Sequence, residues 1–274
     1  MLQMSSPDKN RREDVAELDG ATQRPMLSSS QRRLVEHVAA QRGFELLTQA
    51  DDSQVTVFSS LVPGTVAVTP IEQGLLVSLD LPTVMSALAS EYGRAAGEGV
   101  VAINENELYA ILGRVFQLCG SLPDHPLHQF EAETAELPSD TEAERLVLQR
   151  IGQDVFRRAL EGYWEGRCAV TGVHDRELLR ASHIRPWSEC TDAERLDVYN
   201  GILLAAHLDA AFDKHLATFS ESGELMLSAR RLSPKAIRLL NPQGQSLVAR
   251  LSERHQAYLA LHRERYFALE AARS

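Results

Sequence analysis

The sequence has 274 residues, of which 44% are hydrophobic, so it is long enough for two domains or for one domain with a long appendage. It contains no apolar run of about 18 residues, and its N-terminal segment lacks the apolar centre of a signal peptide; together these features exclude a membrane span and predict a cytoplasmic protein. Its three cysteines are widely spaced, which argues against a disulfide framework and a four-cysteine zinc site.

The net charge of −10 is unevenly distributed along the chain. Residues 1–140 carry 9 Lys+Arg against 20 Asp+Glu, a net charge of −11, whereas residues 141–274 carry 19 against 18, a net charge of +1. The C-terminal half is therefore nearly neutral, and most of its cations are arginines, which suit two-point contacts with phosphate. The overall negative charge argues neither for nor against a polyanionic substrate of that half.

The first 120 residues predict a disordered tail followed by a small α+β domain. The tail, residues 1–28, is polar and lacks apolar periodicity. Helical patterns cover the residues from a Ser28–Ser30 cap to Gln41, then Leu81–Arg94 and Glu105–Cys119. Strand patterns, separated by turn signals, cover Phe44–Thr48, Gln54–Ser60, Thr65–Thr69 and Gly74–Leu79. The domain, residues 29–120, carries no motif that we can assign, and its acidity favours a protein or a small ligand as its partner over DNA.

Residues 121–140 contain three prolines and an acidic run, and we interpret them as a linker. The C-terminal domain, residues 141–274, then opens with a capping box formed by Thr141 and Glu144, which begins an amphipathic helix that ends at Trp164. Farther along, Ser220–Ala229 predicts a hairpin strand and Ser252–Ala271 a closing amphipathic helix.

The C-terminal domain holds a histidine and an asparagine in a distinctive setting. His183 lies late in a predicted strand, which Pro186 ends because proline cannot donate to the strand's hydrogen-bond ladder. A single histidine beside apolar residues is most often structural, and Asn200-Gly201 alone mostly marks a turn. Here the Asn-Gly pair opens a predicted helix that starts near Ile202.

Two carboxylates lie four residues apart on this predicted helix. Asp209 and Asp213 therefore share one helix face, with side-chain bases about 6 Å apart. Two like charges at this spacing destabilise a helix by roughly a few tenths of a kcal/mol unless a cation lies between them. A solvated acidic face is the alternative interpretation of the pair alone. Taken with His183 and Asn200, the pair indicates metal-assisted phosphodiester hydrolysis.

The order of these groups resembles the HNH, or ββα-metal, nuclease family, in the subgroup whose HNH domain is C-terminal. The resemblance is strongest over residues 167–220 and rests on Cys168, Thr171-Gly172, Ala181–Ile184, Pro186-Trp187, Asn200-Gly201 and Asp209–Asp213. It implies a strand hairpin that ends in the histidine, a loop that holds the asparagine, and a helix that carries the metal ligands.

The resemblance also implies a role for each matching residue. His183 matches the general base that activates a water, a task that suits a neutral imidazole near pH 7. Asn200 matches the residue that fixes the loop and so orients the histidine ring. Asp209 and Asp213 match the ligands of one divalent cation, which stabilises charge on the phosphate and on the leaving 3′ oxygen.

The sequence departs from the family pattern in two places. Many members have Asp or His as a third metal ligand just before the base, where this chain has Ser182, whose hydroxyl is a weak ligand. Both helix ligands are carboxylates, where many relatives use histidine. Hard oxygen ligands favour Mg²⁺, with Mn²⁺ as a substitute, over Zn²⁺ or Ni²⁺.

Other polar residues near His183 and Asp213 have weaker signals. Arg180 and Arg185 flank the base in the sequence and are predicted to lie on its side of the strand, in contact with phosphates. His207 and His215 each lie two residues from an aspartate of the acidic pair, so they are predicted to point elsewhere and not to bind the metal.

The sequence thus predicts an α+β protein whose C-terminal HNH domain hydrolyses DNA. Nicking by a monomer is expected, and cutting both strands would need a homodimer or two events. The resemblance suggests restriction or anti-phage defence, in which the N-terminal domain selects a target or senses a signal. One alternative is a nucleic-acid-binding or scaffolding protein that keeps the fold, with Ser182 as a sign of lost catalysis. A second alternative is an RNase or a structure-specific nuclease.

Overall fold

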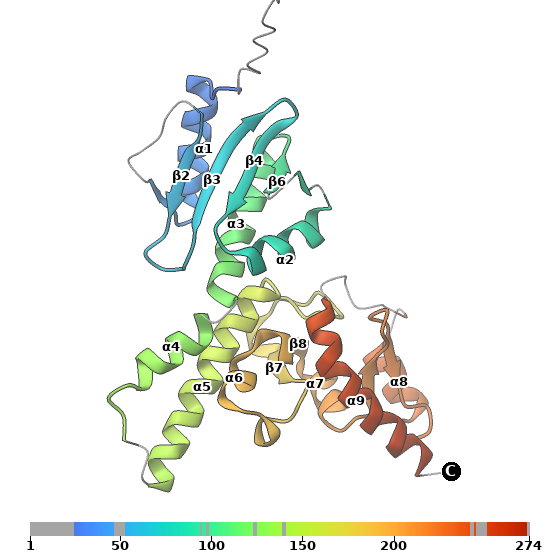
Figure 1. Cartoon of the computed structure of the whole chain (residues 1–274). Coiled ribbons are helices and arrows are strands. Elements are labelled where there is room, and N and C mark those ends of the chain that lie inside the picture. Colours follow the sequence, from blue (N-terminus) through green and yellow to red (C-terminus); the bar gives the residue numbers. More distant parts are fainter. Residues whose placement is uncertain are drawn as a thin grey trace, which may run out of the picture.

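The computed structural model describes residues 25–46, 53–93, 95–96, 99–122, 125–138, 141–241, 244 and 251–272. Figure 1 shows an upper part built around a sheet and a lower part made mostly of helices; we call residues 25–122 the N-terminal part and residues 125–272 the C-terminal part. Residues 1–24 of the predicted tail lie outside the described residues. Leu27 is buried in the core, so the tail prediction extends too far.

The N-terminal part is an antiparallel sheet with helices packed on one face. The strands run in the order β1-β2-β3-β4-β6-β5. Side chains along β2, β3 and β4 alternate between buried and half-buried, as expected when one sheet face packs on helices and the other meets solvent. The strands are β1 (Glu45–Leu46), β2 (Val55–Phe58), β3 (Thr65–Ile71), β4 (Gly74–Leu79), β5 (Ala95–Ala96) and β6 (Gly99–Ala102).

The helices of this part confirm their sequence patterns. They are α1 (Ser29–Gln41), α2 (Pro82–Tyr92) and α3 (Glu105–Ser121). Ser28 caps α1 through a capping box with Gln31, and Asn104 caps α3. The sequence patterns missed β5 and β6, because these runs of two and four residues are too short to show a period. Residues 47–48 and 94, which the predictions also covered, lie outside the described residues.

The segment that we interpreted as a linker contains a helix, so that interpretation is wrong for most of it. Helix α4 (His125–Thr134) packs along α5 (Glu142–Tyr163), and its Leu127 and Phe130 contact the core. Pro126 lies in the first turn of α4, where the missing N–H of proline costs no helical hydrogen bond. Residues 123–124 and 139–140 lie outside the described residues. Helix α5 begins with the predicted capping box of Thr141 and Glu144.

The C-terminal part wraps short strands and helices around the second half of α5. After α5 the elements are η1 (Arg176–Leu178), β7 (Leu179–His183), η2 (Trp187–Glu189), α6 (Asp192–Leu196), η3 (Val198–Asn200), β8 (Gly201–Ala205), α7 (Ala206–Asp213), β9 (Ala217–Phe219), β10 (Leu225–Leu227), α8 (Pro234–Leu240) and α9 (Glu253–Ala271). β9 and β10 form the predicted hairpin, and α9 is the predicted closing helix. Among the described helices, none is long and apolar enough to cross a membrane.

The segment after Asn200 corrects a sequence prediction. The pattern predicted a helix from about Ile202, whereas Gly201–Ala205 is strand β8, which pairs antiparallel with β7, and the helix begins only at Ala206. All five residues of β8 are buried, and a short apolar run with both faces buried has the same pattern in a strand and in a helix. The two strands of the domain therefore lie on either side of Asn200, not both before it.

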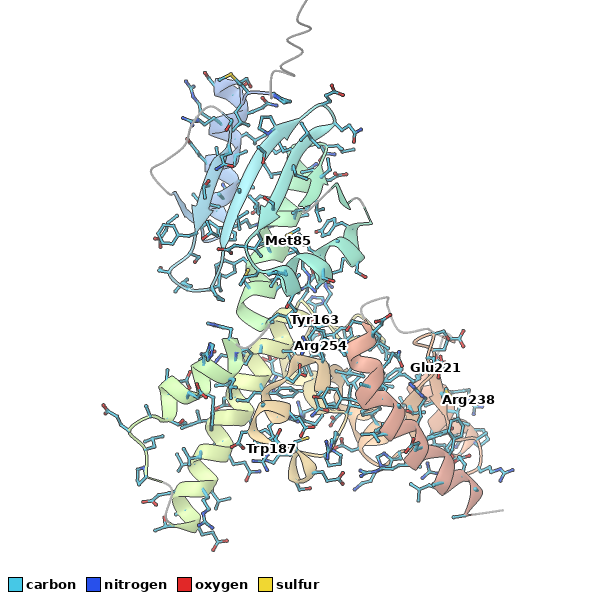
Figure 2. All side chains as sticks on the ribbon, in the orientation of Figure 1. Met85, Tyr163, Trp187, Glu221, Arg238 and Arg254 are labelled. Atoms are coloured by element: carbon cyan, nitrogen blue, oxygen red, sulfur yellow. The ribbon has the colours of Figure 1, made fainter. Side chains whose placement is uncertain are left out.

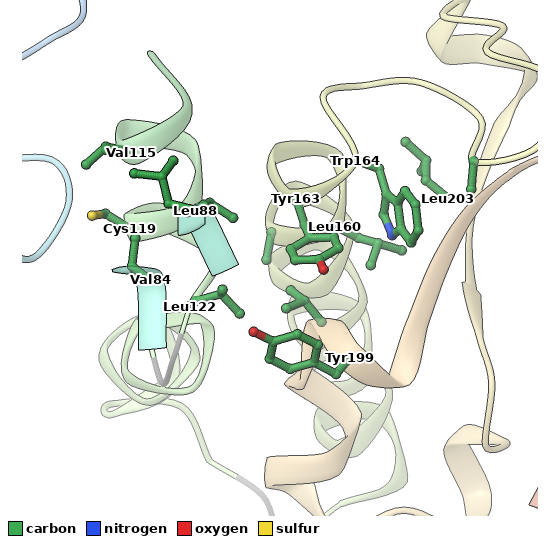
Figure 3. Close-up of a cluster of buried hydrophobic side chains, with 14 of the residues drawn as sticks. Val84, Leu88, Val115, Cys119, Leu122, Leu160, Tyr163, Trp164, Tyr199 and Leu203 are labelled. Carbon is green, nitrogen blue, oxygen red and sulfur yellow. The ribbon is translucent and has the colours of Figure 1, made fainter. Parts of the chain in front are cut away.

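The N-terminal and C-terminal parts share one continuous core. Helix α3 packs against α5, and Leu122 lies at the end of α3 beside Tyr199, with Tyr163 close by (Figure 3). Arg114 of α3 is 2% exposed, forms a two-point ion pair with Glu91 of α2 at 2.6 and 2.8 Å, and donates to the carbonyl of Gly162 at 3.2 Å. A charged and an apolar contact therefore join the two parts.

Candidate active site

One cavity in the C-terminal part brings together most of the predicted site residues. Its volume is about 670 Å³, and its walls come from α5, β7, η2, α7 and α9. Trp187 of its wall lies on the far side of the C-terminal part from Tyr163 and Arg254, which lie at the junction with the N-terminal part (Figure 2). The lining includes the predicted residues Arg180, Ser182, His183, Asp209 and Asp213.

Strand pairing explains why residues from two distant segments meet here. Leu179 at the start of β7 pairs with Ala205 at the end of β8, so α7, which begins at the next residue, packs against β7. Asp209 and Asp213 lie one turn apart on α7, on the side that faces the cavity. The hydrophobic residues Leu208, Ala211 and Phe212 occupy the buried side of the same helix.

The two aspartates repel each other across this turn. Loss of solvent, and then the charge of Asp209, raises the pKa of the Asp213 carboxyl above its ordinary value. A cation bound between the two carboxylates would remove this repulsion. Ser182 lines the same cavity, and its Oγ is buried and has no hydrogen-bond partner in the described part of the chain, so it is a third candidate oxygen.

These three oxygens fit a hard divalent cation that keeps several of its waters. Mg²⁺ commonly binds proteins through one or two carboxylates and completes its octahedron with water and phosphate oxygens. Within the described residues, no group of three or more His, Cys, Asp or Glu side chains could hold a metal ion, so these residues form no closed protein-only cage of the kind that structural Zn²⁺ prefers. The magnesium site itself stays a prediction.

The ring of His183 is clamped on three sides. It stacks on Phe156 of α5, with ring centroids 3.9 Å apart and an angle of 17° between the planes. The ring of Trp187 meets it edge-on at 5.3 Å. Nε2 of His183 lies 2.9 Å from the carbonyl oxygen of Arg195. These contacts fix the orientation of the imidazole in the cavity wall.

The contact with Arg195 also fixes the tautomer of His183. A carbonyl oxygen can only accept, so Nε2 carries the hydrogen and the neutral ring keeps an unprotonated Nδ1. This Nδ1 is not buried, and none of the hydrogen bonds of the described residues uses it. Burial lowers the pKa of His183 below its usual 6.5, although the bond to Arg195 acts in the opposite direction. The ring is therefore neutral near pH 7, with Nδ1 free to accept a proton.

Asn200 is fully buried and connects the segments around His183. Its Oδ1 accepts from the backbone N–H of Arg185 at 2.8 Å, and its Nδ2 donates to the carbonyl of Glu194 at 3.0 Å. Its own carbonyl accepts from the N–H of Ile184 at 2.9 Å. The side chain thus holds α6, which supplies the Arg195 carbonyl, against the residues that follow His183. This is the arrangement expected of a residue that orients the histidine ring.

The two arginines that were predicted to contact phosphate lie in different surroundings in the structure. Arg180 lines the cavity, and its guanidinium donates to the carbonyls of Glu177 and Leu179. Arg185 does not line the cavity, because its guanidinium pairs with Glu194 at 2.7 Å. The prediction that both arginines lie on the side of His183 is therefore wrong for Arg185, since β7 ends before it and the chain turns away.

Several cavity residues had no recognisable sequence signal. Phe156 and Arg157 of α5 contribute a stacking ring and a cation, but they lie some 26 positions before His183, and only the fold brings them close. Lys214 and His215, just after the end of α7, line the same cavity, so the prediction that His215 points elsewhere is wrong, because the helix ends before it. His207 is exposed and is not part of the lining, as its helix position predicted.

Two antiparallel strands and a helix, with a histidine at the end of the first strand and an acidic pair on the helix, form the arrangement of a ββα-metal nuclease domain. A family model described as HNH endonuclease matches residues 168–220, so this region of the chain is an HNH domain. The match includes His183, Asn200, Asp209 and Asp213. It begins well after the N-terminal part and covers none of it. No curated protein matches the chain.

Proposed function

We propose that this protein is a metal-dependent endonuclease that hydrolyses phosphodiester bonds in DNA. The observation that carries the proposal is a clamped, neutral His183 whose free Nδ1 lies in the same cavity as two mutually repelling aspartates and an unpartnered serine hydroxyl. A base and a cation-binding set in one cavity are the two components that metal-assisted phosphodiester hydrolysis uses.

In this mechanism His183 accepts a proton from the water that attacks the phosphorus, using Nδ1. The bond from Nε2 to the Arg195 carbonyl holds the ring in place and favours the imidazolium that forms, because a carbonyl stabilises a donor more strongly when that donor is charged. Asn200 acts on His183 indirectly, by keeping α6 and its carbonyl in position. Arg180 contacts a phosphate beside the scissile one.

Asp209, Asp213 and Ser182 would hold one Mg²⁺, with Mn²⁺ as a substitute. When bound, the cation would polarise the phosphate oxygens and stabilise charge on the leaving 3′ oxygen. We further propose that the protein nicks one strand as a monomer, cuts both strands only as a homodimer or in two events, and acts in restriction or anti-phage defence. By analogy alone, its N-terminal part selects the target or senses a signal.

Plasmid nicking tests this proposal. Wild-type protein should convert supercoiled plasmid to open circles with Mg²⁺ or Mn²⁺ and should be inactive in EDTA. His183→Ala and Asp213→Asn should lose nearly all nicking, whereas His207→Ala, which alters an exposed histidine outside the cavity, should keep it. Equal activity with Zn²⁺ alone would contradict the proposed assignment of the metal ligands.

Two other outcomes would favour the alternatives. If the metal-loaded protein shifts plasmid on a gel without cutting it, the chain is a nucleic-acid-binding protein that retains an HNH fold. If it cuts single-stranded or structured RNA and leaves duplex DNA intact, it is a ribonuclease.

A further inference from the structure

His215 has a backbone conformation that is unusual for its residue type. It follows Lys214, the residue that ends α7, and its φ of 50° lies in the left-handed region; Glu165 is the other non-glycine residue with positive φ in the described part of the chain. Such a conformation costs roughly 1 kcal/mol or more for a residue with a Cβ, and it persists only where surrounding contacts enforce it.

Three contacts enforce the conformation of His215. Its N–H donates to the carbonyl of Phe212 at 2.8 Å, and its carbonyl accepts a hydrogen bond from the guanidinium of Arg231. Arg231 is itself fixed by an ion pair with Glu270 at 2.9 Å. The ring Nδ1 of His215 lies 3.0 Å from Nε2 of His262. Both the backbone and the ring of His215 are therefore held.

The surroundings of His262 determine which nitrogen of His215 carries a hydrogen. His262 is buried and stacks on Phe212 at 3.9 Å, and its Nε2 lies 3.1 Å from the Phe212 carbonyl, which can only accept. Nε2 of His262 therefore carries a hydrogen, and its Nδ1 accepts from the hydroxyl of Thr218 at 2.9 Å. Nδ1 of His215 is then an acceptor, so the hydrogen of its neutral ring is on Nε2.

This Nε2–H is available to a ligand in the cavity. His215 lines the cavity beside Asp213 and Lys214. Its Nε2 is not buried, and no hydrogen bond of the described residues uses it. A phosphate that approaches the two aspartates is repelled by them, so donors and cations elsewhere in the wall are needed to hold it.

We propose that His215 is a substrate-binding residue that donates its Nε2–H to a non-bridging phosphate oxygen of duplex DNA in this cavity. The inference rests on the proposed nuclease function and adds a phosphate contact to it. His262 and Thr218 are positioning residues, since they act through the tautomer and the orientation of the His215 ring.

Two variants that differ mainly in hydrogen bonding test this contact. His215→Leu and His215→Gln both place a side chain that is not branched at Cβ at the strained position, but glutamine keeps an N–H donor. We would measure the affinity of each for a fluorescent DNA duplex by anisotropy, in Mg²⁺ and in EDTA, in a His183→Ala background that prevents cleavage. His215→Leu should bind about tenfold more weakly, the effect of losing one hydrogen bond to a charged oxygen, while His215→Gln should stay within about threefold.

Further measurements distinguish substrate contact from a structural role. In the active background, His215→Leu should raise KM about tenfold and change kcat by less than about threefold, and His207→Leu should change neither. If leucine and glutamine variants bind like the parent, or if both bind equally weakly and melt at lower temperature, His215 does not contact phosphate. If the His183→Ala parent does not bind duplex DNA and the wild-type protein does not cut it, the proposed function fails and the inference falls with it.

Discussion

The imidazole of His183 and the amide of Asn200 depend on each other through the backbone of α6. His183 donates to the carbonyl of Arg195, and Asn200 donates to the carbonyl of Glu194, one residue earlier. A single short helix, which begins with a capping box between Thr191 and Glu194, therefore accepts hydrogen bonds from both side chains. Removing either hydrogen bond should therefore disturb the position of the other side chain, because both bonds end on the backbone of α6.

Asn200→Ala should reduce both stability and nicking. The variant leaves the N–H of Arg185 and the carbonyl of Glu194 without their partner, which should lower the free energy of unfolding by about 1–3 kcal/mol. The nicking rate should fall by more than the loss of folded protein accounts for, because α6 no longer holds the His183 ring. Urea unfolding and plasmid nicking measure the two effects. Asn104→Ala is the matched control: it removes the exposed cap of α3, costs about 1 kcal/mol, and should leave nicking intact.

A second residue, His255, makes the stability of the fold depend on pH. His255 is fully buried, its Nδ1 accepts from the N–H of Ser252 at 3.1 Å, and burial, with a smaller contribution from Arg254, lowers its pKa from 6.5 to about 3. Tyr163, Trp164 and Tyr199 surround the ring, and none of these three neighbours carries a charge that would compensate a positive charge there.

The protein should therefore lose stability as the pH falls below about 6.5. Between that pH and about 3, the unfolded chain binds a proton at His255 that the folded chain does not, so the free energy of unfolding rises with pH across this window. Urea unfolding at pH 7.5, 6.0 and 5.0 measures the slope. His255→Gln, which can still accept from Ser252, should remove about one proton from that slope; an unchanged slope would show that His255 is protonated in the folded state.

At the scale of elements, the crossing of β8 over α5 controls the position of the His183 ring. Gly201 pairs with His183 in the strand ladder, and a Cβ at Gly201 would lie 2.5 Å from Phe156 and 2.8 Å from Leu160. Phe156 is the ring on which His183 stacks, so a displacement of Phe156 would also disturb the imidazole. Glycine is thus required here for close approach of strand and helix, not for a turn.

Gly201→Ala should impair the site through this contact. Overpacking should destabilise the protein by about 1–3 kcal/mol and displace Phe156, so nicking should fall while affinity for a DNA duplex changes little. Thermal melting and nicking rates would be compared with those of Gly201→Ala combined with Phe156→Leu. The double variant should recover part of the stability, because the obstructing ring is gone, and none of the nicking. Full activity in Gly201→Ala would contradict the role of the crossing.

At the scale of the whole molecule, the N-terminal and C-terminal parts are joined by a buried ion pair as well as by apolar packing. Arg114→Ala would leave the carboxylate of Glu91 at the junction without its cation, and it would remove one of the donors to the Gly162 carbonyl, which still accepts from the N–H of Glu165. We expect a loss of about 2–4 kcal/mol, less than for a fully enclosed pair because Glu91 is partly exposed. Limited proteolysis should also cut faster near the junction.

The surface pair of Arg158 and Glu133 is the control for this prediction. Both side chains are more than one-third exposed, so Arg158→Ala should change the unfolding free energy by less than about 1 kcal/mol. Equal effects of the two substitutions would mean that the Arg114 contact does not stabilise the junction.

The order and spacing of His183, Asn200 and the two aspartates, which resemble the HNH family, singled these residues out in the sequence, although each is a weak signal alone. The structure brings His183 and the two aspartates into one cavity wall, while their roles stay predictions. The same reasoning placed β8 in a helix, since a buried apolar run of five residues has no period that separates the two. It missed Phe156 and the Arg195 carbonyl, because a stacking partner and a backbone acceptor are selected by tertiary contact and carry no local pattern.

The pairing of β7 with β8 makes the intervening residues 184–200 a closed loop, with His183 and Gly201 at its neck. The entropy of closing such a loop grows only with the logarithm of its length, so a doubling costs roughly 0.6 kcal/mol. Insertions that spare Trp187 and α6 should therefore be well tolerated. His183 would stay in place where the two strands pair, while the longer loop would offer additional surface for recognising a target.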